Sequence, residues 1–194
     1  MANLIEEIME SLNPEVSKQL SNNMGIRQED AMQMIPAVAP LILGGLKRQM
    51  EQRGGPDRVD HILNKYGRAD VLDRIGDEIG MRSRAENPDP RLGGLLGESG
   101  VLASDTISKQ LNIDPGIALK IIPALAPIIL GALSNKRDKA GMGATGIASL
   151  IDQDGDGDVL DDVAGFLFKG LSSSGSSQSR GLLGVLGGLF SRKK

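Results

Sequence analysis

The chain has 194 residues, enough to bury a hydrophobic core as one large domain or two small ones. It contains no cysteine, which excludes disulfides, thiolate metal sites and cysteine nucleophiles. The formal net charge is only −3, and acidic and basic residues interleave between Lys47 and Arg91. This pattern is typical of a solvated mixed surface and argues against a nucleic-acid partner.

The first residues, 1–8, have no basic region followed by an apolar stretch, so they do not resemble a secretory signal. No run approaches the roughly 20 apolar residues that cross a bilayer. We therefore expect a soluble cytoplasmic protein. With no Trp, one Tyr and three Phe, its core must be built from aliphatic residues and Met.

The first predicted helix start is Asn13-Pro14, where a capping side chain precedes a proline suited to the first helical turn. An apolar segment follows at residues 35–46, with Pro36 and Pro40 spaced four apart on one helix face. Each interior proline removes a backbone hydrogen bond and bends a helix. The segment therefore predicts short capped helices joined by a kink in place of one long rod.

His61, the single histidine, lies on a helical segment and is expected to be an ordinary surface residue. No Ser-His-Asp arrangement, phosphate-binding glycine loop with its lysine, or zinc ligand set can be assembled from the chain. We expect the protein not to be an enzyme.

The chain then repeats itself. Ile35-Pro-Ala-Val-Ala-Pro-Leu-Ile-Leu-Gly-Gly-Leu46 returns as Ile122-Pro-Ala-Leu-Ala-Pro-Ile-Ile-Leu-Gly-Ala-Leu133, and Val16-Ser-Lys-Gln-Leu20 returns as Ile107-Ser-Lys-Gln-Leu111. Asp114-Pro115 is the second predicted helix start.

Each proline-containing segment is expected to be the central buried helix of its half, the alternatives being a ligand groove or a membrane hairpin. No alternating strand pattern is present. The sequence predicts an all-α helical bundle built from an internal duplication, with kinked Pro-containing central helices. The first half covers residues 1–98 and the second covers residues 99–171, joined somewhere near residues 97–104.

The strongest chemical signal is an aspartate-rich loop in the second half. Its candidate metal ligands are Asp152, Asp154, Asp156, Asp158, Asp161 and Asp162. Carboxylates at loop positions one, three and five, a glycine at six and a backbone carbonyl at seven are the pattern of an EF-hand calcium loop. Gly157 and Asp158 fill positions six and seven, and Val159 suits the aliphatic position eight. Six carboxylates within eleven residues repel one another, and a bound divalent cation, Ca2+ before Mg2+, compensates them.

One position departs from the EF-hand pattern, because position twelve is Val163 where an EF-hand has a bidentate Glu. The site is therefore EF-hand-like. The alternative is an acidic, solvent-facing turn whose aspartates cap the next helix. The matching loop of the first half, Asn64 to Asp70, has Lys65 and Arg68 in place of carboxylates. We expect one metal at most, in the second half, with basic side chains standing in for the cation in the first.

Beyond this loop, residues 172–179 form a Ser/Gly linker, and residues 180–194 carry a Gly/Leu-rich helix with a basic end at residues 192–194. The Gly/Leu stretch can mediate self-association, lie on a membrane surface, or dock onto its own half. Docking is favoured because the stretch echoes Arg91-Leu-Gly-Gly-Leu-Leu-Gly97.

The duplicated Ile-Pro-Ala-x-Ala-Pro core, the Leu-Gly-Gly-Leu-Leu-Gly stretch and the aspartate motif together resemble bacterial YidB-like proteins, over roughly residues 5–190. That family has a domain of unknown function. The resemblance implies an all-helical bundle in which one helix is wrapped by several others, and it implies no activity. Our expectation is a non-enzymatic calcium-binding helical protein. The alternative is a metal-independent structural or assembly protein that self-associates or binds a protein partner through its Gly-Leu-rich helices.

Overall fold

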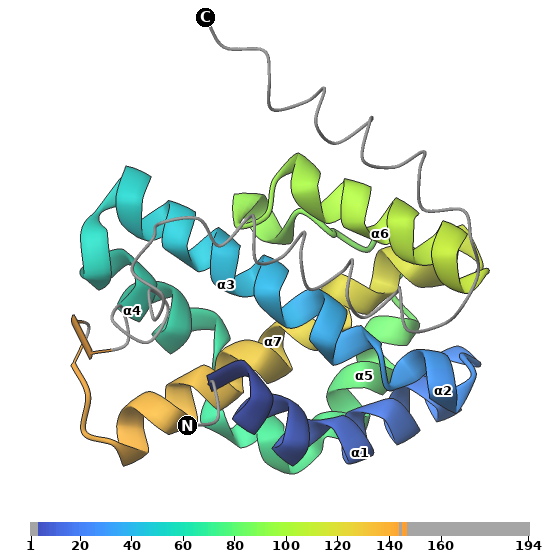
Figure 1. Ribbon diagram of the computed structural model, residues 1–194, viewed down its shortest axis with the longest axis horizontal. Coiled ribbons are helices and arrows are strands. Elements are labelled where there is room, and N and C mark those ends of the chain that lie inside the picture. The colour runs from blue at the N-terminus through green and yellow to red at the C-terminus, as the bar shows by residue number, and fades with distance from the viewer. Residues whose placement is uncertain (1–3, 144, 147–194) are drawn as a thin grey trace, which may run out of the picture.

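The computed structural model describes residues 4–143, 145 and 146, and every regular element within them is helical (Figure 1). The predicted all-α class is confirmed for this part of the chain. The elements are α1 (Leu4–Met24), α2 (Gln28–Ala31), α3 (Met34–Arg53), α4 (Gly55–Tyr66), the 3₁₀ helix η1 (Ala69–Arg74), α5 (Ile75–Ser83), the 3₁₀ helix η2 (Leu92–Gly94), α6 (Glu98–Leu111) and α7 (Pro115–Lys139).

One predicted helix start is confirmed and the other is wrong. Asp114 caps α7, because its Oδ1 accepts hydrogen bonds from the backbone N–H groups of Gly116 (2.8 Å) and Ile117 (3.2 Å). Asn13 caps nothing, since α1 runs through it and carries Pro14 in its interior.

The reason lies in the buried face of α1. Leu12, Val16 and Leu20 recur every four residues and are 7 %, 0 % and 0 % exposed. This apolar stripe continues across Pro14, so burying it favours one helix on both sides of the proline.

The two proline-containing segments are also continuous, which contradicts the predicted short helices. Pro40 lies inside α3, and Pro123 and Pro127 lie inside the 25-residue α7. An interior proline costs about 3 kcal/mol, whereas each fully buried aliphatic side chain contributes about 1.5–3 kcal/mol. Ile121, Leu125 and other α7 side chains are 0 % exposed, so burial outweighs the prolines.

Helix α7 is the centre of the fold. It packs against α1, α3, α4, α5, α6 and η1, and Figure 1 shows it running diagonally behind α3. This arrangement matches the expected bundle, in which several helices surround one. It also confirms that the apolar Pro-Ala-Gly segment of the second half is a buried core helix.

The expectation that no segment is apolar enough to cross a membrane needs correction. By length and composition, α7 is such a helix, with a mean hydropathy of 2.1 over its most apolar window. Lys120, the prolines and Gly131 interrupt the run in the sequence and hide its overall hydropathy. Of that window, 67 % is buried inside the structure, as in the core helix of a bundle.

The Gly-Leu stretch of the first half docks internally onto α3. Leu95 and Leu96 are buried, and the Arg48 guanidinium donates a hydrogen bond to the Leu95 carbonyl (2.8 Å). A Cβ at Gly45 would lie 2.9 Å from that carbonyl oxygen, so only glycine permits this approach. The C-terminal Gly/Leu stretch and the Ser/Gly linker lie outside the described residues.

The similar sequence segments occupy similar places in the helix order. Residues 16–20 end near the C-terminus of α1, ahead of α3, and residues 107–111 end α6, immediately ahead of α7. Duplication of the whole bundle stays a prediction, because the second half beyond residue 146 lies outside the described residues.

Candidate functional site

The predicted metal ligands, Asp152, Asp154, Asp156, Asp158, Asp161 and Asp162, all lie outside the described residues. Within the described ranges, no group of three or more His, Asp or Glu side chains is placed to hold a metal ion. The structure does describe the loop of the first half that matches it in sequence.

This first-half loop joins α4 to η1. Helix α4 ends at Tyr66, and Gly67 turns the chain, its N–H donating to the Leu63 carbonyl (2.8 Å). Arg68 then adopts an extended conformation before η1 begins at Ala69.

Asp70 sits between two arginines at the start of η1. Arg68 donates from Nε to Oδ1 (3.0 Å) and from Nη2 to Oδ2 (3.2 Å), while Arg74 donates from Nη2 to Oδ2 (2.6 Å). These charge-assisted bonds satisfy both carboxylate oxygens. The hydrogen bond from Arg68, together with the charges of Arg68 and Arg74, holds the pKa of Asp70 below its usual range. The same bond raises the pKa of Arg68.

The loop is pressed against α7 through two glycines. A Cβ at Gly67 would lie 2.5 Å from the Leu130 carbonyl oxygen. A Cβ at Gly131 would lie 2.6 Å from Val71 Cγ1 and 2.9 Å from the Arg68 carbonyl oxygen. Backbone therefore packs directly on backbone at this seam.

The sequence predicts that Lys65 and Arg68 stand in for a cation in this loop. The structure shows Arg68 paired with Asp70 and adds Arg74 as a second partner of that carboxylate. Lys65 instead lies over the ring of Tyr66, its Nζ 5.0 Å from the ring centre. The sequence did not predict the bond from Arg74, although the register that aligns Asp70 with Asp158 also aligns Arg74 with Asp162.

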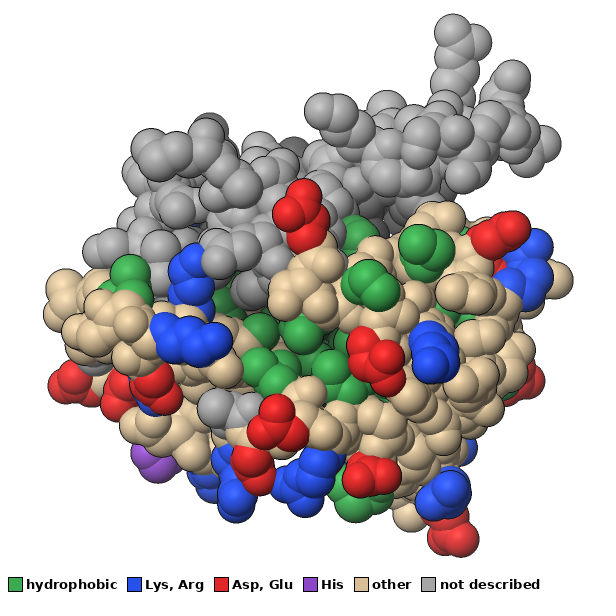
Figure 2. Space-filling model, turned by 90° about the horizontal axis from the view of Figure 1, so that it is seen from below, with side chains coloured by type: hydrophobic (Ala, Val, Ile, Leu, Met, Phe, Trp, Pro, Cys, Tyr) green, Lys and Arg blue, Asp and Glu red, His purple; other side chains and the backbone are tan. Residues whose placement is uncertain are grey.

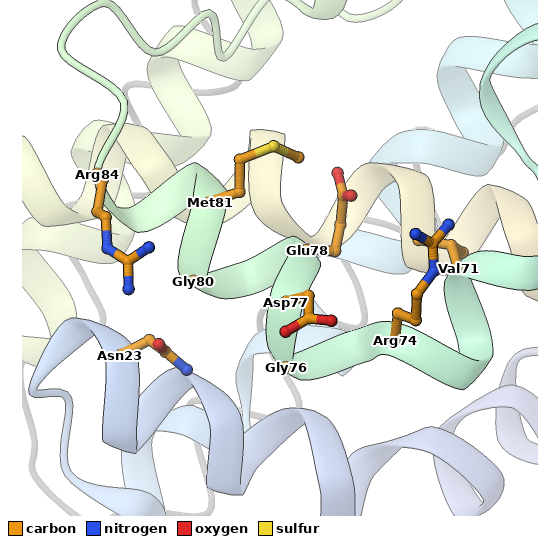
Figure 3. Close-up of a pocket in the computed structure, with 9 residues that line it drawn as sticks. All are labelled: Asn23, Val71, Arg74, Gly76, Asp77, Glu78, Gly80, Met81 and Arg84. Carbon is orange, nitrogen blue, oxygen red and sulfur yellow. The ribbon is translucent and has the colours of Figure 1, made fainter.

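A second candidate is the cleft between α1 and the η1–α5 segment, with a volume of about 430 Å3 (Figure 3). It is lined by Asn23, Val71, Arg74, Gly76, Asp77, Glu78, Gly80, Met81 and Arg84. Gly76 and Gly80 allow α5 to lie close to α1. A Cβ at Gly76 would lie 3.0 Å from the side-chain amide of Gln19, and a Cβ at Gly80 would lie 3.0 Å from Asn23 Oδ1.

Charges of both signs surround this cleft. Figure 3 shows Arg84 reaching toward Asn23, while Glu78 and Met81 point away from α1. Glu78 is paired with Arg82 (3.0 Å), whereas Arg84 and Asp77 form no ion pair with another described residue. Asn23, Asp77 and Arg84 give the cleft polar groups that can hydrogen-bond a polar ligand.

The remaining described surface is mixed. His61 is exposed on α4, as expected for a surface residue. Figure 2 shows basic and acidic side chains alternating around a central group of hydrophobic ones, with no large area of one sign on that face.

Comparison with known proteins identifies one family. No curated protein and no solved structure matches the chain. Residues 6–136, which include every element from α2 to α6 and nearly all of α1 and α7, match the family described as "Bacterial protein of unknown function (DUF937)". This agrees with the YidB-like resemblance of the sequence, and the chain belongs to the DUF937 family of bacterial proteins.

Proposed function

We propose that this protein is a calcium-binding helical protein, with a binding role and not a catalytic one. One Ca2+ ion is held by the loop that contains Asp152, Asp154, Asp156, Asp158, Asp161 and Asp162. The observation that carries the proposal is the pairing of Asp70 with Arg68 and Arg74 in the matching loop of the first half.

The two loops are related by a constant offset of 88 positions. It aligns Gly67 with Gly155 and Asp70-Val-Leu-Asp73 with Asp158-Val-Leu-Asp161. In this register the two arginines that neutralise Asp70 both become aspartates, Arg68 matching Asp156 and Arg74 matching Asp162.

The charge at these three positions therefore reverses. Two arginines and one aspartate sum to +1 in the first loop, whereas the second loop has three aspartates and sums to −3. Asn64 and Tyr66 are also replaced, by Asp152 and Asp154. An ordered loop with this charge needs cations that these loop positions no longer supply, and a divalent ion provides them.

Calcium suits this set of ligands better than magnesium does. It accepts six to eight oxygens in a flexible shell, whereas Mg2+ requires a near-ideal octahedron and retains several waters. The acids at alternate positions and Gly157 at the turn fit calcium, and Asp161 and Asp162 are the acids nearest to the missing position-twelve Glu.

Calcium should raise the melting temperature of the metal-free protein. A ligand that binds only the folded state at 100 times its Kd adds about 2.7 kcal/mol. For a chain of this size that corresponds to a rise of roughly 5–10 °C. Scanning calorimetry with and without millimolar calcium checks this. The Asp154→Ala/Asp156→Ala variant should lose the response, and unchanged melting of the wild type would rule the proposal out.

A second variant tests the charge-reversal argument itself. Asp156→Arg/Asp162→Arg copies the arginines of the first loop into the second. We expect this variant to melt higher than the wild type in EDTA and to show no further rise with calcium. A variant that melts no higher than the wild type in EDTA would contradict the idea that the arginines and the metal are interchangeable.

A further inference from the structure

We propose that residues 155–168 of the second half pack onto α3 in the way that residues 67–80 of the first half pack onto α7. The two halves would then exchange their loop-and-helix units and form a single intertwined bundle. This inference concerns where the acidic loop lies and holds with or without calcium.

The packing of the first-half unit onto the second half is seen directly in the described structure. Although η1 and α5 belong to the first half of the chain, they pack against α7 of the second half. At its closest points, Gly67 abuts the Leu130 carbonyl and the Ser134 hydroxyl, and Gly131 abuts Val71 and the Arg68 carbonyl.

Four of these residues recur unchanged in the other half, whereas Ser134 corresponds to Lys47 and Arg68, which contributes its backbone carbonyl, corresponds to Asp156. The loop offset of 88 positions takes Gly67 to Gly155 and Val71 to Val159. The helix offset of 87 positions, set by Ile35 and Ile122, takes Leu130 to Leu43 and Gly131 to Gly44. These four pairs are identical, including both glycines, whose missing side chains make the observed approach possible. The sequence thus repeats both sides of the contact.

Helix α3 has a partly exposed face onto which residues 155–168 could pack. Ala37, Leu41 and Gly44 follow one another at helical spacing and form a half-buried stripe. Their counterparts on α7, Ala124, Ile128 and Gly131, are fully buried. Similar residues are therefore covered on α7, by the first-half unit among others, and left partly open on α3.

The chain is long enough to reach this stripe. The described part ends at residue 146, beyond the C-terminus of α7, and eight residues, 147–154, separate it from residue 155. The nine Cα-to-Cα steps from residue 146 to residue 155 span about 30 Å when extended, the length of a 20-residue helix such as α3. In Figure 1 the orange end of the described chain lies on the same side of the view as α4, which follows α3 directly.

The same correspondence matches Lys47, which is 4 % exposed, with Ser134, whose hydroxyl donates a hydrogen bond to the Leu63 carbonyl (3.4 Å) just before the first-half loop. Docking would bring the Lys47 ammonium to the matching carbonyl of Ile151, at the entry to the acidic loop, where a cation is electrostatically favourable.

Disulfide trapping tests the contact directly, because the chain has no cysteine of its own. The Gly44→Cys/Val159→Cys variant should oxidise to an intramolecular disulfide, seen as a faster-moving monomer on non-reducing gels. The matched control is Gly131→Cys/Val71→Cys, whose contact is observed. A control that links while the test pair stays reduced would overturn the inference, as would a test pair that links only between two chains.

Thiol labelling provides a second test that does not place a side chain at either glycine. Leu41→Cys should react slowly in the otherwise unchanged chain and about tenfold faster or more once Val159→Asp disrupts docking. Leu125→Cys, fully buried in α7, should stay protected in both backgrounds and so reports global unfolding. Equal reactivity of Leu41→Cys in both backgrounds, with Leu125→Cys still protected, would contradict docking.

Both tests are run in calcium and in EDTA, so that the two proposals fail separately. A disulfide without any effect of calcium on melting leaves docking intact and removes the calcium site. If calcium raises the melting temperature but the disulfide does not form, the calcium site stands and the docking proposal fails.

Discussion

At the scale of single residues, the described structure shows how an acidic loop residue is compensated. Asp70 keeps its charge because Arg68 and Arg74 bind both of its oxygens. The sequence predicted the role of Arg68 from the contrast with the aspartate-rich loop. It did not predict the bond from Arg74, because that residue lies a full turn of η1 further on and contacts Asp70 only once the 3₁₀ helix has formed.

Asp70→Asn should reduce stability at neutral pH but not in acid. The pKa of Asp70 is lowered in the folded state. Its contribution is therefore complete above the ordinary carboxyl pKa of about 4 and is lost as the pH falls through the lower folded value. Urea unfolding of both proteins between neutral pH and pH ~2 should show their difference shrinking to zero. Asp73→Asn is the control, because Asp73 forms no ion pair with another described residue. A difference for Asp70→Asn that grows in acid would refute this account.

At the scale of elements, glycines decide where helices and loops meet. Gly45, Gly67 and Gly131 each allow a contact with a backbone carbonyl that a Cβ would block. A glycine in the sequence shows that a close approach is sterically possible, but it does not name the partner. Those partners are 50 to 63 residues away in the chain, so no local pattern reveals them.

Gly67→Ala should lower the free energy of unfolding by about 1–3 kcal/mol, the usual cost of overpacking. The cause is steric, because φ at Gly67 is −102°, which alanine adopts without strain, while the new Cβ would lie 2.5 Å from the Leu130 oxygen. Urea denaturation of purified variants measures the change. Gly143→Ala serves as the matched control, since a Cβ there meets nothing within 4 Å and should change stability little. Equal stability of the two variants would show that the loop does not press on α7.

Helix boundaries were predicted best where a local interaction sets them. Asp114 caps α7 through bonds to residues two and three positions on, which a sequence pattern captures. The continuity of α1 across Pro14 and of α7 across Pro123 depends on burial against other helices. That tertiary contribution overrides the local cost of proline and is invisible in a short window of sequence.

At the scale of the whole molecule, one apolar helix surrounded by the others explains how the protein forms a hydrophobic core with so few aromatic residues. The core is built from Ile, Leu, Val, Met and Ala, and α7 contacts most of the other elements. The resemblance to a known family and the repeated sequence together predicted this all-helical arrangement. They did not predict that a unit of one half packs on the central helix of the other, because the repeat alone fits two separate bundles equally well.

The central claim is that charge compensation passes from arginines in the first half to a metal ion in the second. Isothermal titration calorimetry of the metal-free, full-length protein with CaCl2 at neutral pH tests it most directly. We expect saturable uptake of about one ion per chain, retained in Asp70→Asn and abolished in Asp154→Ala/Asp156→Ala. Absence of calcium uptake by the wild-type protein, or equal uptake by the double variant, would contradict it.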